Sequence, residues 1–388
     1  MKGLINIVIF YLFAIGCQNS NTNTEFNFKS FELKESPKTT GLSLSELEFK
    51  VIEYIPLESN DLCLIKSINE IRFGESFFLI KSFNNVLKFN IDGTFSSKIG
   101  TIGRGPNEYT DVMDIDINKE NQDIYLVSTW QKKFIAYSKE GDFIRAFHCP
   151  QNTSNFRITR DGILCYNRNT LGNVEASYNL MDFDGSEIKN YSNRYQWVKS
   201  QRDMYVFVYE NLFYRFNNTL FKKEVYSDTI YVFEGLNFKP RYVITAGKRL
   251  ITPEARSKFN PIYIGKNYII PFNMFAFGNY IYYEYAIEQK FIFGFIGSFK
   301  DNFTAYINQG QGLINDLDGG PNIWPRTIKD DNTVISWIDA ITIKNHVSSK
   351  AFKNSTPKYP EKKKELEKLA DSLKDTDNPV LVMVSLKQ

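Results

Sequence analysis

The stretch FNIDGTF at residues 89–95 decides the fold, because it reads as two strand ends joined by an Asp92-Gly93 turn. An Asp-Gly pair supplies the positive φ angles that a tight hairpin turn needs. Two further stretches repeat this unit, YSKEGDF at residues 137–143 and MDFDGSEI at residues 181–188. Their turn glycines lie 48 and then 44 residues apart, close to the roughly 40–50 residues of a four-stranded propeller blade. The repeat therefore predicts a β-propeller.

Further strand-like runs precede these hairpins, at residues 71–80, 122–127 and 156–166. Apolar residues alternate with polar ones in the units, so each interval is expected to hold about four strands. A fourth, degraded unit is predicted at residues 214–220, where Asn217-Asn218 takes the place of the acidic residue and glycine. Asparagine tolerates the left-handed backbone region that such a turn requires.

Composition favours one mostly β domain. The 388 residues include 33 Phe and 23 Tyr, and aromatic side chains pack well on pleated sheets. Two separate β-sandwiches would need a linker near the middle, yet no run rich in Pro, Ser, Gly or charge interrupts residues 46–345. The net charge of +3 is small, and no dense Lys/Arg tract occurs among the aromatic residues. We therefore expect no nucleic-acid partner.

The N-terminus predicts export. Met1-Lys2 supplies a short positive region, and residues 4–15 form an apolar run that is too short to span a bilayer, which takes about 20 residues. The run AIGC at residues 14–17 resembles the bacterial lipobox, with Ala14 where that motif usually has Leu.

From this pattern we expect a lipoprotein signal peptide at residues 1–16 and a lipid on Cys17, which would anchor the protein to a membrane. Residues 17–45 are expected to form a polar tether and leader. The alternative is that Cys17 lies beside an ordinary cleavage site.

The other cysteines, Cys63, Cys149 and Cys165, indicate neither a disulfide framework nor a zinc site, because their number is odd and no CxxC spacing occurs. Buried free thiols in neighbouring strands are the expected state, with a Cys149–Cys165 bridge as the alternative. The sequence predicts no cofactor and no metal ion.

One longer segment carries a family resemblance. Residues 98–109 (KIGTIGRGPNEY), followed by Asp114, Asp116 and a strand at residues 124–127, resemble the most distinctive stretch of the six-bladed β-propeller lipoproteins of Gram-negative bacteria. Segments similar to later landmarks of that family stand at residues 227–231, 239–242, 314–320 and 377–384. The resemblance implies six blades, kinship with propellers built from NHL repeats, and no established activity.

The C-terminus predicts how the ring closes. Residues 361–374 have apolar side chains at helical spacing, and residues 379–386 read as a strand. Pairing this last strand with the first strands, around residues 49–55, would remove an exposed sheet edge. We therefore expect an all-β, six-bladed propeller over residues 46–388, closed by the C-terminal strand, with a short helix before that strand.

The glycine-rich loop at residues 100–105 does not match a phosphate-binding motif, because the spacing differs and no helix follows. It is expected to cross one face of the propeller. Arg104, Glu108 and Tyr109 then either brace neighbouring blades or face the central pocket, and in the second case they are candidate ligand-binding residues.

The segment NDLDGG at residues 315–320 offers oxygen ligands at alternate positions, like the start of a calcium loop. It lacks Glu at the twelfth position, so a polar turn is the prediction and calcium the alternative. Trp324 and Arg326, just after it, are candidate parts of a wall that faces a ligand.

Catalysis has little support in the sequence. There are only two histidines, His148 and His346, and no G-x-S-x-G elbow. We expect a binding protein of the cell envelope that is not an enzyme. Its ligand would be a glycan, a peptide or a partner protein. It would be anchored to the outer membrane, facing the periplasm or the surface. The alternative is an envelope hydrolase or lyase that acts on a polysaccharide through carboxylates or a metal ion.

Overall fold

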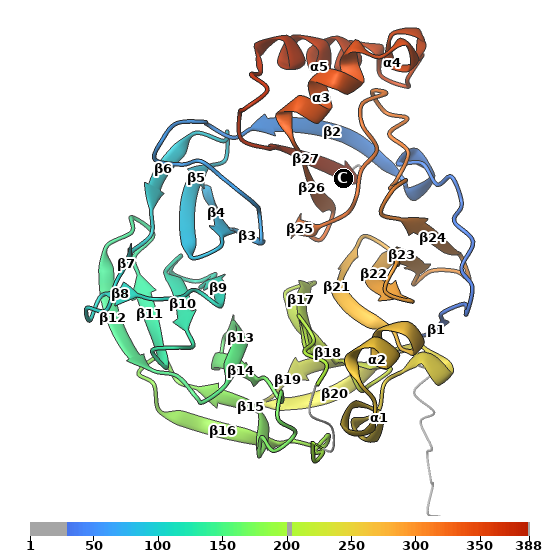
Figure 1. The fold of residues 1–388 in the computed structure, drawn as a ribbon. Coiled ribbons are helices and arrows are strands. Elements are labelled where there is room, and N and C mark those ends of the chain that lie inside the picture. Colours follow the sequence, from blue (N-terminus) through green and yellow to red (C-terminus); the bar gives the residue numbers. More distant parts are fainter. Residues whose placement is uncertain (1–28, 200–203, 387–388) are drawn as a thin grey trace, which may run out of the picture.

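The protein is a ring of six β-sheets around a central axis (Figure 1). A computed structural model describes residues 29–199 and 204–386. Within them each sheet is a blade of four antiparallel strands, and one blade carries an additional parallel strand. The predicted all-β, six-bladed propeller is confirmed. The predicted signal peptide and Cys17 lie outside the described residues.

The blades are numbered here in chain order, and their strands are given from the centre outward. Blade 1 contains β3 (Glu70–Phe73), β4 (Phe77–Ser82), β5 (Asn85–Asn90) and β6 (Phe95–Lys98). Blade 2 contains β9 (Asp114–Ile117), β10 (Ile124–Ser128), β11 (Lys133–Tyr137) and β12 (Phe143–His148). Blade 3 contains β13 (Thr153–Thr159), β14 (Gly162–Asn167), β15 (Ala176–Met181) and β16 (Glu187–Ser192).

Blade 4 contains β17 (Asn211–Phe216), β18 (Thr219–Glu224), β19 (Thr229–Glu234), β20 (Asn237–Thr245) and, outermost, β1 (Lys29–Glu32). Blade 5 contains β21 (Ile270–Phe277), β22 (Tyr280–Ile287), β23 (Phe291–Ser298) and β24 (Thr304–Asn308). Blade 6 contains β25 (Thr327–Asp330), β26 (Thr333–Ile338), β27 (Val380–Leu386) and β2 (Phe49–Pro56). A short parallel pair, β7 (Thr101–Ile102) and β8 (Glu108–Tyr109), lies between blades 1 and 2.

Blade 6 closes the ring as predicted, because the C-terminal strand β27 pairs antiparallel with the N-terminal strand β2. On its other side β27 pairs with β26, so blade 6 combines the early strand β2 with three strands from the C-terminal part of the chain. The predicted helix before the last strand is α5 (Pro360–Ser372). Its buried Leu366 and Ala370 pack in a cluster with Val380 of β27.

In blades 1, 2 and 3, a turn made of an acidic residue followed by glycine joins the third strand to the fourth. Gly93, Gly141 and Gly185 have φ angles of 89°, 101° and 91°, in the left-handed region that favours glycine. At Gly93 a Cβ atom would also lie 2.3 Å from the carbonyl oxygen of Pro56. Glycine is therefore needed there for backbone conformation and for space.

The degraded fourth unit is a hairpin, but at a different place in its blade. Asn217 and Asn218, with φ angles of 50° and 55°, join the first and second strands of blade 4. The turn that corresponds to Gly93 lies instead at Gly235-Leu236, which joins the third and fourth strands. An Asn-Asn pair can form a turn with positive φ angles between any two neighbouring strands. The sequence of this hairpin therefore did not show which two strands of the blade it joins.

The N-terminal segment extends the propeller beyond the predicted start at residue 46. Strand β1 pairs in parallel with β20 at the outer edge of blade 4. Phe31, Leu42 and Leu44 are buried in the largest apolar cluster. The described part of the predicted leader, from Lys29 onward, therefore packs against the domain.

Four α-helices in the described residues were not predicted. Two of them, α1 (Pro253–Lys258) and α2 (Pro261–Asn267), connect blades 4 and 5, and two more, α3 (Ala340–Ser348) and α4 (Lys350–Asn354), precede α5. Thr252 and Asn260 cap α1 and α2, because their side chains accept hydrogen bonds from the third residue beyond them. Each cap is followed by a proline at the first helical position, where its missing N–H costs nothing.

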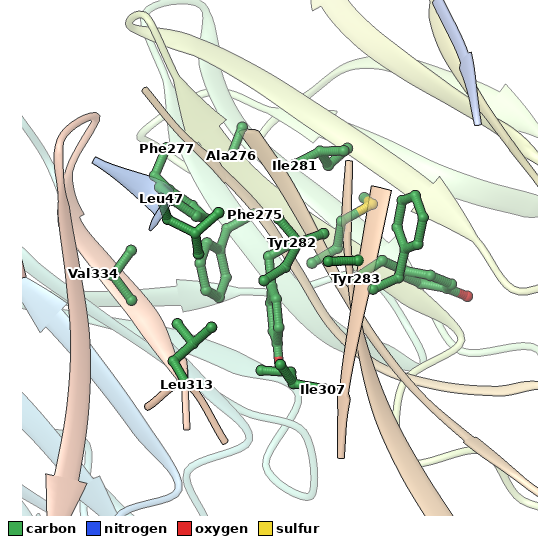
Figure 2. Close-up of a cluster of buried hydrophobic side chains, with 14 of the residues drawn as sticks. Leu47, Phe275, Ala276, Phe277, Ile281, Tyr282, Tyr283, Ile307, Leu313 and Val334 are labelled. Carbon is green, nitrogen blue, oxygen red and sulfur yellow. The ribbon is translucent and has the colours of Figure 1, made fainter. Parts of the chain in front are cut away.

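Aromatic side chains fill the spaces within and between the blades. Figure 2 shows part of the largest cluster, in which Phe275 and Tyr282 of the β21–β22 hairpin lie among buried aliphatic side chains that include Val334 and Leu313. The rings of Phe275 and Tyr282 have centroids 4.9 Å apart. This packing fixes the position of blade 5 relative to blade 6.

Cys63, Cys149 and Cys165 are buried free thiols, so the alternative of a Cys149–Cys165 bridge is not observed. Cys149 and Cys165 belong to the same apolar cluster in blades 2 and 3. No helix in the described residues has the length and apolar character needed to cross a membrane.

Candidate functional site

A cavity with a volume of about 1210 Å³ lies at the centre of the ring, and it is called the channel below. Side chains from all six blades line it, because the inner strands β3, β9, β13, β17, β21 and β25 surround the axis. Ligand pockets for small molecules typically measure about 300–1000 Å³. This channel is therefore large enough for an extended ligand.

Carboxylates on β9 hold the inner strand of the next blade. Asp114 and Asp116 point to the same side of β9, as residues two apart in a strand do. One oxygen of Asp114 accepts a 2.8 Å hydrogen bond from the backbone N–H of Phe156, and one oxygen of Asp116 accepts a 2.8 Å bond from that of Ile158. These side chains therefore replace the ladder hydrogen bonds that the inner strand β13 lacks on that side.

Three arginines neutralise this acidic pair. Arg157 Nη1 lies 2.8 Å from Asp114 Oδ2, and Arg215 Nη2 lies 3.0 Å from Asp116 Oδ2. Arg72 lies 3.7 Å from Asp114 and 3.8 Å from Asp116. Charges from four inner strands thus form one network, which braces blades 1 to 4.

Burial and the neighbouring arginines shift the pKa values of the acids in this network. Burial opposes ionisation of Asp116, but the guanidinium groups of Arg215, Arg157 and Arg72 outweigh it and lower the pKa of Asp116 to about 2. Glu70, on β3, pairs with Arg72 and with Arg157, yet burial dominates and raises its pKa to about 7. Asp116 is therefore charged at neutral pH, whereas Glu70 titrates there.

A second group of polar side chains lies on the wall made by blades 5 and 6. Glu284 on β22 is only 5% exposed, and Arg326 stands just before β25. Burial raises the pKa of Glu284, while the charge of Arg326 and hydrogen bonding to the side chains of Trp324 and Asn273 act in the opposite direction. The guanidinium of Arg326 lies over the ring of Trp337, 5.4 Å from its centroid.

The backbone of Arg326 is held on both sides. Its N–H donates a 2.9 Å hydrogen bond to the carbonyl of Ile335, and its carbonyl accepts a 2.5 Å bond from the side-chain amide of Asn273. Arg326, Asn273, Glu284 and Trp337 all line the channel. Blades 5 and 6 thereby present a positioned acid, a guanidinium and an amide to its interior.

The predicted site residues fall into two groups. Arg326 lines the channel and the buried side chain of Trp324 lies beside Glu284, so the structure brings these two together. Arg104 lies in the loop between β7 and β8, and Glu108 and Tyr109 form β8; all three are outside the residues that line the channel.

The β7–β8 loop is tied to blade 2 and to itself. Glu108 accepts a 2.8 Å hydrogen bond from the N–H of Gly105, and Tyr109 donates one of 2.8 Å to the carbonyl of Ile99. Tyr137 of β11 donates a 3.0 Å bond to the carbonyl of Asn107. These contacts link the loop to blades 1 and 2. A role for Arg104, Glu108 and Tyr109 in ligand binding stays a prediction.

The NDLDGG segment forms a turn that is bonded within the protein. Asp316 accepts a 3.1 Å hydrogen bond from the N–H of Ser45 and lies 3.3 Å from Lys358. Asp318 accepts one of 2.9 Å from the N–H of Gly320. In the described part of the chain, no group of three or more His, Cys, Asp or Glu side chains is placed to hold a metal ion.

Glu284, Asn273 and Trp337 were not found from the sequence. One signal for Glu284 was present, because it is a lone acid in the aromatic and aliphatic run YIYYEYAI at residues 280–287. An acid in a buried strand is seldom tolerated without a partner or a role. Asn273 and Trp337 gave no comparable signal, because their positions depend on how blades 5 and 6 are placed against each other.

Comparison with known proteins supports the fold. No curated protein is similar to the chain in sequence. A candidate exported protein of Bacteroides fragilis superimposes with a TM-score of 0.68 at 18% identity, covering 92% of this chain and 99% of that one. A DUF4221 family member from Bacteroides vulgatus gives a TM-score of 0.51 at 10% identity, covering 87% and 97%. Residues 28–385 match the family described as domain of unknown function DUF4934, and the chain belongs to this family.

Proposed function

We propose that the protein is an exported, lipid-anchored propeller of the cell envelope that binds a ligand in its central channel without converting it. The observation that carries this proposal is the channel itself, with a volume of about 1210 Å³ and a wall of positioned charged and amide side chains. Such a concave site with a few fixed polar groups is the usual form of a binding site. A glycan, a peptide or a segment of an envelope protein would fit its size.

The proposed location has separate support. The lipobox-like run at residues 14–17 places Cys17 where a lipid would be attached, and a structural relative is described as a candidate exported protein. Anchoring in the outer membrane, facing the periplasm or the surface, completes the proposal. Incorporation of labelled palmitate by the wild type but not by Cys17→Ala, in a Gram-negative host, would support it; equal labelling would contradict it.

Ligand binding is tested by thermal shift with the full-length protein in detergent, against pools of envelope peptides and oligosaccharides. A ligand that binds only the folded state raises the melting temperature. The variant Thr327→Trp adds bulk at a residue that lines the channel, whereas Thr304→Trp adds it on the outer strand β24. We expect the shift to disappear in Thr327→Trp and to remain in Thr304→Trp. A shift that survives both would place the ligand elsewhere.

One observation favours the alternative of a polysaccharide hydrolase or lyase. Glu284 is a buried carboxylate with a raised pKa, as a general acid requires. By contrast, Asp114 and Asp116 are occupied by backbone N–H groups and arginines. Release of new sugar ends by the wild type and its loss in Glu284→Gln would establish catalysis, whereas binding without products would support the binding protein.

A further inference from the structure

Two oppositely charged side chains on the channel wall remain without a charged partner. No cationic nitrogen of the described residues lies within 4.0 Å of the Glu284 carboxylate. The Arg326 guanidinium makes no hydrogen bond or ion pair with any of these residues, and its Nε is buried. Both are close enough to influence each other electrostatically, since Arg326 lowers the pKa of Glu284.

This arrangement differs from the rest of the same channel. Arg157 and Arg215 each contact a carboxylate of β9 at 3.0 Å or less, and Arg72 contacts Glu70 directly. The acids and arginines on the inner strands β3, β9, β13 and β17 therefore pair with one another. On the opposite wall Glu284 has Trp324 and Asn273 as polar neighbours but no cationic partner, and the guanidinium of Arg326 has no hydrogen-bond partner among the described residues. The guanidinium, and the carboxylate lone pairs that its neighbours do not use, can therefore bind a molecule in the channel.

The geometry of these two groups is set by their surroundings. Hydrogen bonds to Ile335 and from Asn273 fix the backbone of Arg326, and Trp337 lies beneath its guanidinium. Glu284 sits in the middle of β22, paired with β21 on one side and β23 on the other. Little side-chain ordering would be needed when a ligand binds, which favours affinity.

The pair selects against charged ligand groups. When Glu284 is ionised, an anion at this place is attracted by Arg326 but repelled by Glu284, and a cation meets the reverse. A hydroxyl group can accept a hydrogen bond from a guanidinium and donate one to a carboxylate at the same time. The half-buried rings of Phe272 and Trp337 on the same wall offer apolar surface to the C–H face of a sugar.

We propose that Glu284, Arg326 and Asn273 form a subsite for a neutral oligosaccharide, with adjacent sugar hydroxyls bridging the acid and the guanidinium. The channel volume of about 1210 Å³ leaves room for several sugar units. The inference rests on the proposed function of the channel, and it names the ligand class.

The test measures binding of full-length protein in detergent to maltohexaose, xylohexaose, cellohexaose and mannohexaose, with hexagalacturonate and a chondroitin sulfate hexasaccharide as acidic probes. We expect at least one neutral hexasaccharide to bind, and Arg326→Gln and Glu284→Gln each to weaken it about tenfold or more. The matched control is Arg241→Gln, which removes an exposed guanidinium from over the Tyr242 ring on β20 and should stay within about twofold of the wild type. Unchanged melting temperatures would show that the variants fold.

Other outcomes separate the subsite from the channel function. Tight binding of only the acidic probes, or equal affinities of wild type, Arg326→Gln and Glu284→Gln for a neutral probe, would overturn the subsite. If a peptide pool but no sugar gives a shift that Thr327→Trp removes, the channel function stands and the sugar subsite falls. If no sugar or peptide pool gives such a shift, both proposals fail.

Discussion

Arg157 Nη1 lies 2.8 Å from Asp114 Oδ2, and this ion pair joins the inner strands of blades 3 and 2 across the wall of the channel. Asp114 is only 3% exposed, and the same oxygen accepts the N–H of Phe156. Removing one partner of such a pair leaves a buried charge uncompensated. The channel wall is therefore also a structural element of the ring.

Asp114→Asn should lower the free energy of unfolding by about 2–4 kcal/mol, because asparagine keeps an acceptor for Phe156 but leaves Arg157 without its closest carboxylate. Urea denaturation followed by fluorescence measures the change. Asp142→Asn, at an exposed turn position, is the control and should change it by less than about 0.5 kcal/mol. Equal stabilities of the two variants would contradict the structural role of the network.

Stability should depend on pH through Glu70. Its pKa is about 7 in the folded protein against an ordinary value of 4.5, so between these values the folded state binds more protons than the unfolded chain. The free energy of unfolding therefore falls as pH rises through this window. Glu70→Gln should flatten the decline by about 3 kcal/mol between pH 4.5 and 7.5, measured by urea denaturation at each pH. An equally steep decline in the variant would assign it to other groups.

Arg256 of α1 and Glu210 form a fully buried ion pair with 2.7 Å between Nη2 and Oε1. Trp197 and Phe207 each have their ring centroid 5.0 Å from the guanidinium. Arg256→Met should therefore destabilise the protein by about 3–5 kcal/mol. The double variant Arg256→Met/Glu210→Met should lose less than Arg256→Met alone, since no buried charge is left. Additive losses in a double-mutant cycle would show that the two side chains are not coupled.

Gly93→Ala should cost much more stability than Gly235→Ala, although both glycines occupy the corresponding turn in their blades. Each has a positive φ, which costs an alanine about 1 kcal/mol. At Gly93 a Cβ atom would also lie 2.3 Å from the backbone oxygen of Pro56, whereas at Gly235 nothing lies within 4 Å. We expect losses of about 3 and about 1 kcal/mol in urea denaturation. Similar losses would mean that backbone conformation alone matters.

These glycines also explain how much of the fold the sequence could predict. Turn chemistry is local, so Asp92-Gly93 and its repeats identified hairpins and their spacing identified blades. The Asn217-Asn218 hairpin was placed at the wrong position in its blade, because the turn type does not depend on which strands it joins. Thr252-Pro253 and Asn260-Pro261 are helix starts that the strong β pattern around them obscured.

The candidate site was less accessible from sequence. Arg326 and Trp324 were singled out by their position after a turn, but Glu284, some 40 residues earlier, joins them only because β22 and the segment before β25 lie side by side in the ring. The role of Asp114 and Asp116 was hidden for the same reason, since their partners Arg157 and Arg215 stand on two other blades. Local patterns do not record contacts between blades.

The central claim, that the channel binds a ligand in the envelope, is tested most directly by a photo-crosslinking amino acid placed at Thr327 on the channel wall. The matched position is Thr304 on the outer strand β24. After irradiation of intact cells, mass spectrometry should find a ligand adduct on the protein labelled at position 327 and none at position 304. Adducts at position 304 alone, or none at either position, would contradict the account.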